Sequence, residues 1–287
     1  MNRRHFLRAG AAGVISLNHF PHHLFAAAKP KNATDRILLG PRKIELSRMA
    51  MGTGTSGSNG SSNQTRKLGY HGVAELFRAA YDQGINFWDS ADQYGSHTYI
   101  REALKTVPRE KVVILTKTNS TTAAAVKADI DRYRRELGVD TIDILLLHNQ
   151  QAADWNVRMR PCMDVISEAR DRGIIRTHGT SCHTLPALKT AAAEPWVEVD
   201  LARLNPAGLH MDSTPENVIA VLRQMKQAGK GVIGMKILAQ GDLRHKADEA
   251  LQFAMAQDCL DGITIGSESR AEMEDLLRKI PAASVRG

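Results

Sequence analysis

The chain has 287 residues, of which 43% are hydrophobic and 24% are charged, a composition typical of a folded protein with a sizeable core. The net charge of +7 is diffuse, and no lysine and arginine cluster with interleaved aromatic residues occurs, which argues against a nucleic-acid partner. Three cysteines without a Cys-x-x-Cys motif indicate neither a disulfide framework nor a cysteine-rich metal site: Cys162, Cys182 and Cys259.

The first thirty residues have the composition of a targeting segment. A basic start with Arg3 and Arg4 precedes a weakly apolar stretch, and three alanines end at Ala28. This order predicts a secretory signal over residues 1–28, although a basic tail or an uncleaved anchor would look similar. The run Arg-Arg-His-Phe-Leu-Arg resembles the twin-arginine export signal, which implies the twin-arginine export machinery as a partner and a periplasmic location. No other stretch approaches 18 consecutive apolar residues, so no membrane span is expected in the mature form.

From residue 35 onward, apolar runs of strand length alternate with helical patterns. Strands are predicted within residues 44–52, 85–91, 111–117, 142–148, 173–181, 197–205, 231–238 and 261–267. Helices are predicted within residues 71–83, 97–106, 121–138, 161–172, 185–193, 213–231, 246–257 and 270–279. Such an alternation over about 250 residues predicts a (β/α)₈ barrel, a TIM barrel, over residues 35–284. An open doubly wound sheet is the alternative, but the chain lacks the strand–GxGxxG–helix fingerprint.

Local signals refine this prediction. Thr214 is a natural helix N-cap, with Pro215 at the first helical position, and Gly138 ends the preceding helical pattern of residues 121–138. Two short strands about Gly40-Pro41 predict an N-terminal hairpin across the barrel floor. The Gly/Ser-rich run of residues 52–64 predicts a mobile loop at the opposite end.

Polar residues interrupt the apolar pattern where three consecutive strands end. Asp89 and Tyr94 close the second strand, Lys117 the third and His148 the fourth. In a (β/α)₈ barrel these ends form the catalytic face, and a buried charge is costly unless it is paired. A cation beside a phenol lowers its pKa from about 10, so Tyr94 beside Lys117 would be a proton donor. Simpler interpretations remain: a structural Asp89–Lys117 ion pair, a surface tyrosine and a hydrogen-bonded core histidine.

The three motifs that carry these residues, GINFWDSADQYG, VVILTKT and DILLLHN, resemble those of the aldo-keto reductases in the same order. This resemblance, over residues 35–280, implies an NAD(P)H-dependent reduction of a small carbonyl substrate, an aldehyde or ketone, to an alcohol. It also implies a catalytic tetrad with Tyr94 as proton donor, formed by Asp89, Tyr94, Lys117 and His148.

The same resemblance places the cofactor along the later strand ends. It implies that the nicotinamide and pyrophosphate contact Ser181, Met235 and Lys236, and that the adenosine end contacts Gly266, Ser267 and Glu272. Members that bind a 2′-phosphate carry cations where this chain has Gly266 and Glu272, so NADH is expected to bind at least as well as NADPH. Ser269 and Glu272 also have the spacing of a helix capping box.

The chain departs from the family pattern after the fifth and sixth strands. Gly-Thr-Ser-Cys-His places Cys182 where the family has asparagine, and Cys182 is expected to be a packed residue rather than a nucleophile. His183 faces the substrate or caps the loop. Arg203 and Asn205 are polar for a buried strand, and pairing with barrel carboxylates is preferred over lining the site.

Two other functions remain possible from the sequence. One is a cofactor-binding but catalytically idle barrel that acts as a sensor or partner protein. The other is a metal-dependent barrel hydrolase that uses His148, His183 and Asp89, although the clustered His-x-His of an early strand is absent. The intact tetrad favours the reductase over both.

Overall fold

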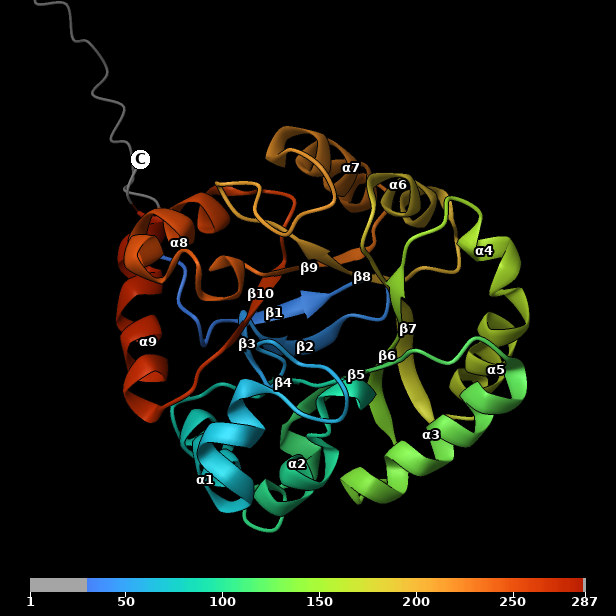
Figure 1. Cartoon of the computed structure of the whole chain (residues 1–287), viewed down its shortest axis with the longest axis horizontal. Helices are drawn as coiled ribbons and strands as arrows, with labels where there is room; N and C mark the ends of the chain where they lie inside the picture. The colour runs from blue at the N-terminus through green and yellow to red at the C-terminus, as the bar shows by residue number, and fades with distance from the viewer. Residues whose placement is uncertain (1–29, 286–287) are drawn as a thin grey trace, which may run out of the picture.

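Eight short apolar runs form the parallel strands of a closed barrel in the computed structural model, which describes residues 30–285 (Figure 1). Each barrel strand pairs with the next along the chain, and the last closes the barrel against the first. The (β/α)₈ prediction is confirmed, and the open doubly wound sheet is wrong. The strands are β3 (Met49–Gly52), β4 (Phe87–Asp89), β5 (Val113–Thr118), β6 (Ile142–Gln150), β7 (Ile175–Cys182), β8 (Val199–Arg203), β9 (Gly231–Met235) and β10 (Gly262–Gly266).

Helices follow the barrel strands and cover the outside of the barrel (Figure 1). They are α1 (Asn63–Asp82), α2 (His97–Ala103), α3 (Ala123–Leu137), α4 (Trp155–Arg158), α5 (Arg160–Asp171), α6 (Leu185–Ala193), α7 (Pro215–Gln227), α8 (Ala247–Ala256) and α9 (Arg270–Ser284). Within residues 30–285, none of these helices combines the length and apolar character that a membrane crossing needs.

The predicted hairpin closes the amino end of the barrel. It consists of β1 (Arg36–Leu39) and β2 (Ile44–Ser47), an antiparallel pair, and Gly40 between them has a φ of 59°. Leu39 and Leu46 are fully buried in the same apolar cluster as the inward residues at the starts of the strands, including Phe87, Val113 and Val199. This floor leaves the carboxyl ends of the strands as the end at which a site can open.

The predicted helix caps agree with the structure, but the predicted boundary of the first helix does not. The Thr214 side chain accepts from the Asn217 amide before Pro215, and Gly138 ends α3 in the left-handed conformation, both as predicted. The predicted helix at residues 71–83 forms, but Ser62 caps an earlier helical segment of α1, which the non-helical Gly69 (φ 63°, ψ −173°) separates from it. The Gly/Ser-rich run therefore ends in a helix, and its mobility stays a prediction.

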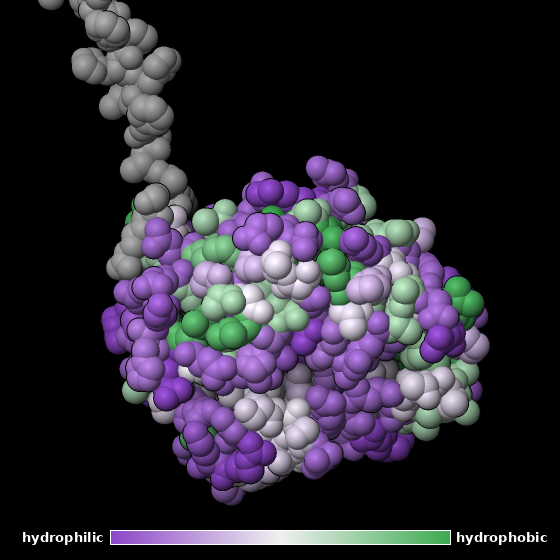
Figure 2. All heavy atoms as spheres, turned by 45° about the horizontal axis from the view of Figure 1, so that its top comes forward, coloured by the Kyte–Doolittle hydropathy of each residue, from purple (hydrophilic) through white to green (hydrophobic). Residues whose placement is uncertain are grey.

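The exposed apolar side chains of residues 30–285 do not gather in one place. Figure 2 shows hydrophobic residues as separate patches on a mostly hydrophilic face. Among the described residues, the large apolar side chains that are exposed are scattered along the chain: Leu38, Tyr70, Val157, Leu209 and Val285. This pattern does not define a docking surface.

Candidate active site

On three neighbouring strands, side chains point alternately into and out of the barrel, and the last inward positions at the carboxyl end are polar. Phe87 of β4, Leu115 of β5 and Leu146 of β6 belong to the core inside the barrel. Side chains two positions apart on a strand face the same side. The next inward positions are therefore those of the charged and polar residues that the sequence singled out, Asp89, Lys117 and His148.

The Lys117 ammonium is held by two groups at the carboxyl end of the neighbouring strand β4. Its Nζ donates to Asp89 Oδ1 at 2.5 Å and to the Ser90 carbonyl at 2.6 Å. The other carboxylate oxygen of Asp89 accepts from Thr264 Oγ1 of β10 at 2.9 Å. Burial of Lys117 disfavours its charge, but Asp89 and Tyr94 together more than offset this, and the pKa of Lys117 lies above its ordinary value. The sequence did not indicate Thr264, which lies on the strand farthest along the chain.

Tyr94 reaches this pair from η1 (Asp92–Tyr94), the 3₁₀ turn that follows β4. Lys117 Nζ lies 5.0 Å from the centroid of the Tyr94 ring. The glycine-rich loop packs against the ring, because a Cβ on Gly54 or Gly57 would lie 2.3 Å from ring carbons of Tyr94. Burial raises the pKa of Tyr94, while the charge of Lys117 acts to lower it. The net pKa lies above the ordinary value, so the lowered pKa expected from the sequence is wrong, and the phenol carries its proton at neutral pH.

His148 lies on the other side of Tyr94. The two rings meet edge to face with centroids 5.9 Å apart, and the His183 ring is 6.3 Å from that of His148. Burial, followed by the charge of Lys117, lowers the pKa of His148 to about 2. Burial and the charge of Arg203 lower the pKa of His183 to about 3. Both rings are therefore neutral near pH 7 and can form hydrogen bonds without supplying a proton.

The polar residues after β7 and β8 have different environments. Cys182 is fully buried, and burial raises its thiol pKa well above the ordinary value, as a packed and unreactive cysteine requires. Arg203 Nε donates to Asp212 Oδ1 at 2.8 Å, so it pairs with a carboxylate as predicted, but with one in the loop after β8 and not on a barrel strand. The same prediction is wrong for Asn205, whose side chain bonds backbone groups of the following loop, including the Leu209 carbonyl at 2.8 Å.

The residues expected to contact the nicotinamide end lie along the carboxyl ends of β7 and β9. Ser181 is buried, and its Oγ accepts from the Asn149 amide at 3.2 Å, which leaves the hydroxyl hydrogen free to donate. Met235 ends β9 inside the barrel. Lys236 follows it with a φ of 56°, and burial together with the nearby Arg203 lowers its pKa to about 8.

The residues expected at the adenosine end surround the start of α9. Ser267 Oγ is buried without a hydrogen-bond partner among the described residues. A Cβ on Gly266 would lie 2.5 Å from Thr55 Oγ1, so the loop fills the space in which a side chain would begin. The Ser269 side chain accepts from the Glu272 amide, but Glu272 accepts from the Glu268 amide at 2.7 Å instead of closing the capping box. Only half of the predicted box therefore forms.

Glu268 is a charged residue at this end that the sequence analysis missed. Its carboxylate accepts from Asn63 Nδ2 at 2.6 Å and pairs with the ammonium of Lys67, so it ties the first turn of α1 to the start of α9. Glu268 and Glu272 thus place two carboxylates at the N-terminus of α9. Lys67 is too far away in the sequence to have been assigned here from spacing alone.

A closed (β/α)₈ barrel with a lysine–carboxylate pair, a tyrosine and a neutral histidine at its carboxyl end defines the class of this protein: barrel proteins with an enzyme-like site at the strand ends. The sequence pattern of the Aldo/keto reductase family matches residues 48–258, most of the chain. The chain belongs to this family.

Characterised relatives and solved structures agree with this assignment. The chain is 22% identical over 218 residues to the D-threo-aldose 1-dehydrogenase of a Pseudomonas species, covering 64% of this chain and 65% of the relative. It is 27% identical over 171 residues to the NADH-specific methylglyoxal reductase of Escherichia coli strain K12, covering 51% of each. The match thus spans about half to two thirds of these curated relatives. The holo form of an aldo-keto reductase from Bacillus halodurans superimposes with a TM-score of 0.70 at 18% identity, covering 86% of this chain and 91% of that chain.

Proposed function

We propose that this protein is an NAD(P)H-dependent oxidoreductase that reduces an aldehyde or ketone to the alcohol, with Tyr94 as the proton donor. Membership of the family supports the reaction class. The observation that carries the proposal is the convergence of Tyr94, Lys117 and His148, since the buried ammonium is 5.0 Å from the Tyr94 ring centroid and the His148 ring lies beside it. A protonated phenol, a fixed cation and a neutral imidazole are what a carbonyl oxygen needs as it gains negative charge.

Each side chain has a defined part in the proposed reaction. Bound NADH or NADPH supplies a hydride to the carbonyl carbon. Tyr94 gives its phenolic proton to the carbonyl oxygen, and the Lys117 ammonium stabilises the phenolate that remains. Asp89 keeps Lys117 charged and in place through the 2.5 Å hydrogen bond. The neutral His148 orients the carbonyl oxygen by a hydrogen bond and does not compete as an acid.

The residues along the strand ends fit a nicotinamide dinucleotide. Ser181 has a free hydroxyl hydrogen that can donate to the amide carbonyl of the nicotinamide, and Met235 offers a flexible apolar surface for its ring. Lys236 can pair with the pyrophosphate. Ser267 Oγ is buried and unpartnered within the described part of the chain, at the start of a helix whose free amides favour anions. An orphaned hydroxyl there is explained if it bonds the cofactor.

The two alternative functions have less support from the site. An idle barrel has no need of a buried Lys117 held by two hydrogen bonds beside a protonated phenol. A metal-dependent hydrolase would use Asp89 as a ligand, but both of its oxygens already accept hydrogen bonds, from Lys117 and from Thr264. The reductase accounts for these contacts, and the alternatives do not.

Replacing Tyr94 by phenylalanine tests the proposal. Tyr94→Phe removes one hydroxyl and little volume, so we expect the kcat for reduction of methylglyoxal or 4-nitrobenzaldehyde to fall by about 10²–10⁴-fold, the scale of general-acid catalysis. The dissociation constant for NADH should stay within twofold of wild type. Retention of full kcat in this variant would remove Tyr94 from the mechanism, and no turnover by wild type over a panel of aldehydes would favour the idle barrel.

The relatives suggest where a search for the substrate should begin. One is named a methylglyoxal reductase that is specific for NADH, and another an aldose dehydrogenase. Small dicarbonyls and aldoses, each with NADH and with NADPH, are therefore the first compounds to assay.

We also propose that the protein is exported by the twin-arginine machinery and acts in the periplasm. The support is the basic Arg3-Arg4 start followed by a weakly apolar stretch and Ala28, which lies outside the described residues and is read from the sequence alone. Export of folded protein by this route is compatible with a cofactor that is bound before the barrel leaves the cytoplasm.

A further inference from the structure

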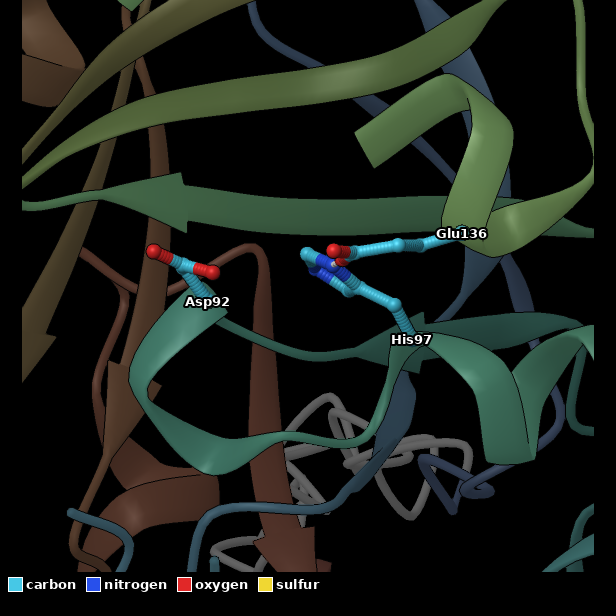
Figure 3. Close-up of side chains that lie close together, drawn as sticks. All are labelled: Asp92, His97 and Glu136. Atoms are coloured by element: carbon cyan, nitrogen blue, oxygen red, sulfur yellow. Dashed lines mark hydrogen bonds and ion pairs between the residues drawn. The ribbon is translucent and has the colours of Figure 1, made fainter. Parts of the chain in front are cut away.

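A cluster of polar side chains lies behind the turn that carries Tyr94. Figure 3 shows His97 of α2 beside Glu136 of α3, with Asp92 of η1 nearby. His97 Nδ1 lies 2.8 Å from Glu136 Oε2, and its Nε2 lies 2.7 Å from Thr116 Oγ1 of β5. Asp92, His97 and Glu136 could by composition ligate a metal, since their ligand atoms lie within 4.8 Å of one another.

A guanidinium occupies this cluster in place of an ion. Arg132 of α3 donates to Asp92 Oδ1 at 2.7 Å, to Glu136 Oε1 at 3.0 Å and to Asp129 Oδ1 at 2.8 Å. Its carbon Cζ lies 4.8 Å from the centroid of the Tyr133 ring, which supports the guanidinium from one face. The three carboxylates therefore converge on Arg132, whose own pKa they raise by hydrogen bonding, Asp92 first.

The cluster connects the two elements that hold the proposed proton donor and its cation. On one side, Asp92 belongs to the same short turn as Tyr94. On the other side, Asp129 Oδ2 accepts from Thr118 Oγ1 at 2.6 Å, and His97 bonds Thr116. Thr116 and Thr118 flank Lys117 on β5. A chain of direct contacts thus joins the backbone of Tyr94 to that of Lys117 through α3.

We propose that Arg132 and Asp92 are positioning residues that set the distance between the Tyr94 phenol and the Lys117 ammonium, a proposal that rests on the proposed role of Tyr94. The 3₁₀ turn is a single turn, which the glycine-rich loop and Asn119 hold through Gln93, and neither Arg132 nor Asp92 touches the reacting atoms. The ion pair supplies a further restraint, the one that ties the turn to α3 and through it to β5. Because displacement of a catalytic group by about 1 Å costs on the order of 10²-fold in rate, a restraint outside the site can control turnover.

The test weakens the ion pair between Asp92 and Arg132 and leaves the residues of the proposed active site unchanged. Asp92→Asn keeps the size of the side chain and removes its charge, so Arg132 retains Asp129 and Glu136 and the fold should persist. We expect the kcat for methylglyoxal reduction with NADH to fall about tenfold, with the NADH dissociation constant and the melting temperature close to wild type. The solvent isotope effect on kcat in D₂O should rise, because proton transfer from Tyr94 becomes slower.

Asp131→Asn is the matched control. Asp131 lies on the same helix and pairs with Arg134 at 3.7 Å, an ion pair that does not involve the turn. We expect its kcat to stay within twofold of wild type. Arg132→Lys is the second variant, because one ammonium can meet Asp92 but cannot bridge three carboxylates. Its kcat should lie between those of Asp92→Asn and wild type.

The Tyr94→Phe background separates this inference from the proposed function. If Asp92 acts through Tyr94, the Asp92→Asn/Tyr94→Phe double variant should be no slower than Tyr94→Phe alone. Two results would overturn the inference while leaving Tyr94 in its role. In the first, Asp92→Asn and Arg132→Lys both have the kcat and the isotope effect of wild type. In the second, Asp92→Asn lowers kcat tenfold in the Tyr94→Phe background as well. Wild-type kcat in Tyr94→Phe itself refutes the proposed function and this inference with it.

Discussion

Glu268 and Glu272 are the residues that we expect to set the choice of cofactor. Both carboxylates lie at the N-terminus of α9, and Glu268 neutralises Lys67, the nearby cation that could meet a 2′-phosphate. A 2′-phosphate needs charge-assisted donors, so NADH should bind at least as tightly as NADPH. Glu268→Gln should free Lys67 and improve NADPH binding by about three- to fivefold, the scale of an exposed ion pair.

Titration of nicotinamide fluorescence with both cofactors measures this preference. Glu272→Gln retains an acceptor for the Glu268 amide and removes only the charge. The change in NADPH affinity in this variant therefore measures the repulsion between the Glu272 carboxylate and the 2′-phosphate. Asp275→Asn, which breaks exposed pairs with Arg278 and Lys279 farther along α9, is the control and should leave both affinities unchanged. Wild-type protein that binds NADPH more than tenfold tighter than NADH would contradict the argument.

Single residues were predictable where a local pattern was broken. Asp89, Lys117 and His148 interrupt apolar strands at one end, and that interruption placed them together before the structure did. Thr264 and Glu268 interrupt no comparable pattern, and their importance arises from partners roughly two hundred residues away, Asp89 and Lys67. Sequence spacing carries no information about such contacts, because the closure of the barrel creates them.

At the scale of elements, the glycine-rich loop of residues 53–62 forms part of the wall around Tyr94. A Cβ on Gly57 would lie 2.3 Å from Tyr94 Cδ1, so Gly57→Ala must displace either the loop or the ring. We expect kcat for carbonyl reduction to fall by at least about tenfold, since misplacement of the acid is costly. Steady-state kinetics with saturating NADH measure it.

Gly72→Ala is the matched control for this element. Gly72 lies in α1, where alanine favours the helix, and the added Cβ would lie 3.2 Å from Leu68 Cβ, a tight contact that a small shift relieves away from Tyr94. Its kcat should equal that of wild type. If Gly57→Ala were as active as Gly72→Ala, the loop would not restrain Tyr94.

Elements were predictable where periodicity was strong and uncertain where polar residues begin a helix. The strands and most helices follow from apolar spacing, but the first turns of α1 are polar and end at the non-helical Gly69, so periodicity indicated only the segment after this kink. The short helix α4 was missed for a different reason, because Trp155–Arg158 is too short for a helical period to emerge.

At the scale of the whole molecule, the proposed export should depend on Arg3 and Arg4. Replacing both with lysine retains the positive charge and removes the paired guanidinium groups that the twin-arginine signal is expected to need. We expect precursor to accumulate in the cytoplasm, which fractionation and immunoblotting would detect. Lysine substitution of Arg8 alone is the control. Normal periplasmic levels of the double variant would show that export does not use this route.

The stability of the whole barrel should depend on pH through Asp200. This β8 carboxyl is fully buried, and neither oxygen has a hydrogen-bond partner among residues 30–285. Nearby Lys230 donates instead to the carbonyls of Ala191 and Glu194. Burial, and then repulsion from Asp212, raises the pKa of Asp200 well above its ordinary value. The folded barrel therefore holds a proton at Asp200 that the unfolded chain releases near pH 4.

The sign of the effect follows from this proton. A carboxyl with a raised pKa in the folded state contributes stability below its unfolded pKa, and that contribution is lost as pH rises toward the folded pKa. The free energy of unfolding should therefore fall between pH 5 and 8, by at most about 1.4 kcal/mol per pH unit from this group.

Asp200→Asn removes the titration. The free energy of unfolding in urea, measured across this pH range, should therefore fall less steeply with pH than in wild type, whatever uniform cost the buried amide adds. Asp164→Asn, at an exposed position of α5, should keep the wild-type slope. Equal slopes for Asp200→Asn and wild type would mean that Asp200 is ionised in the folded barrel and has a partner, such as an ordered water, that meets its charge.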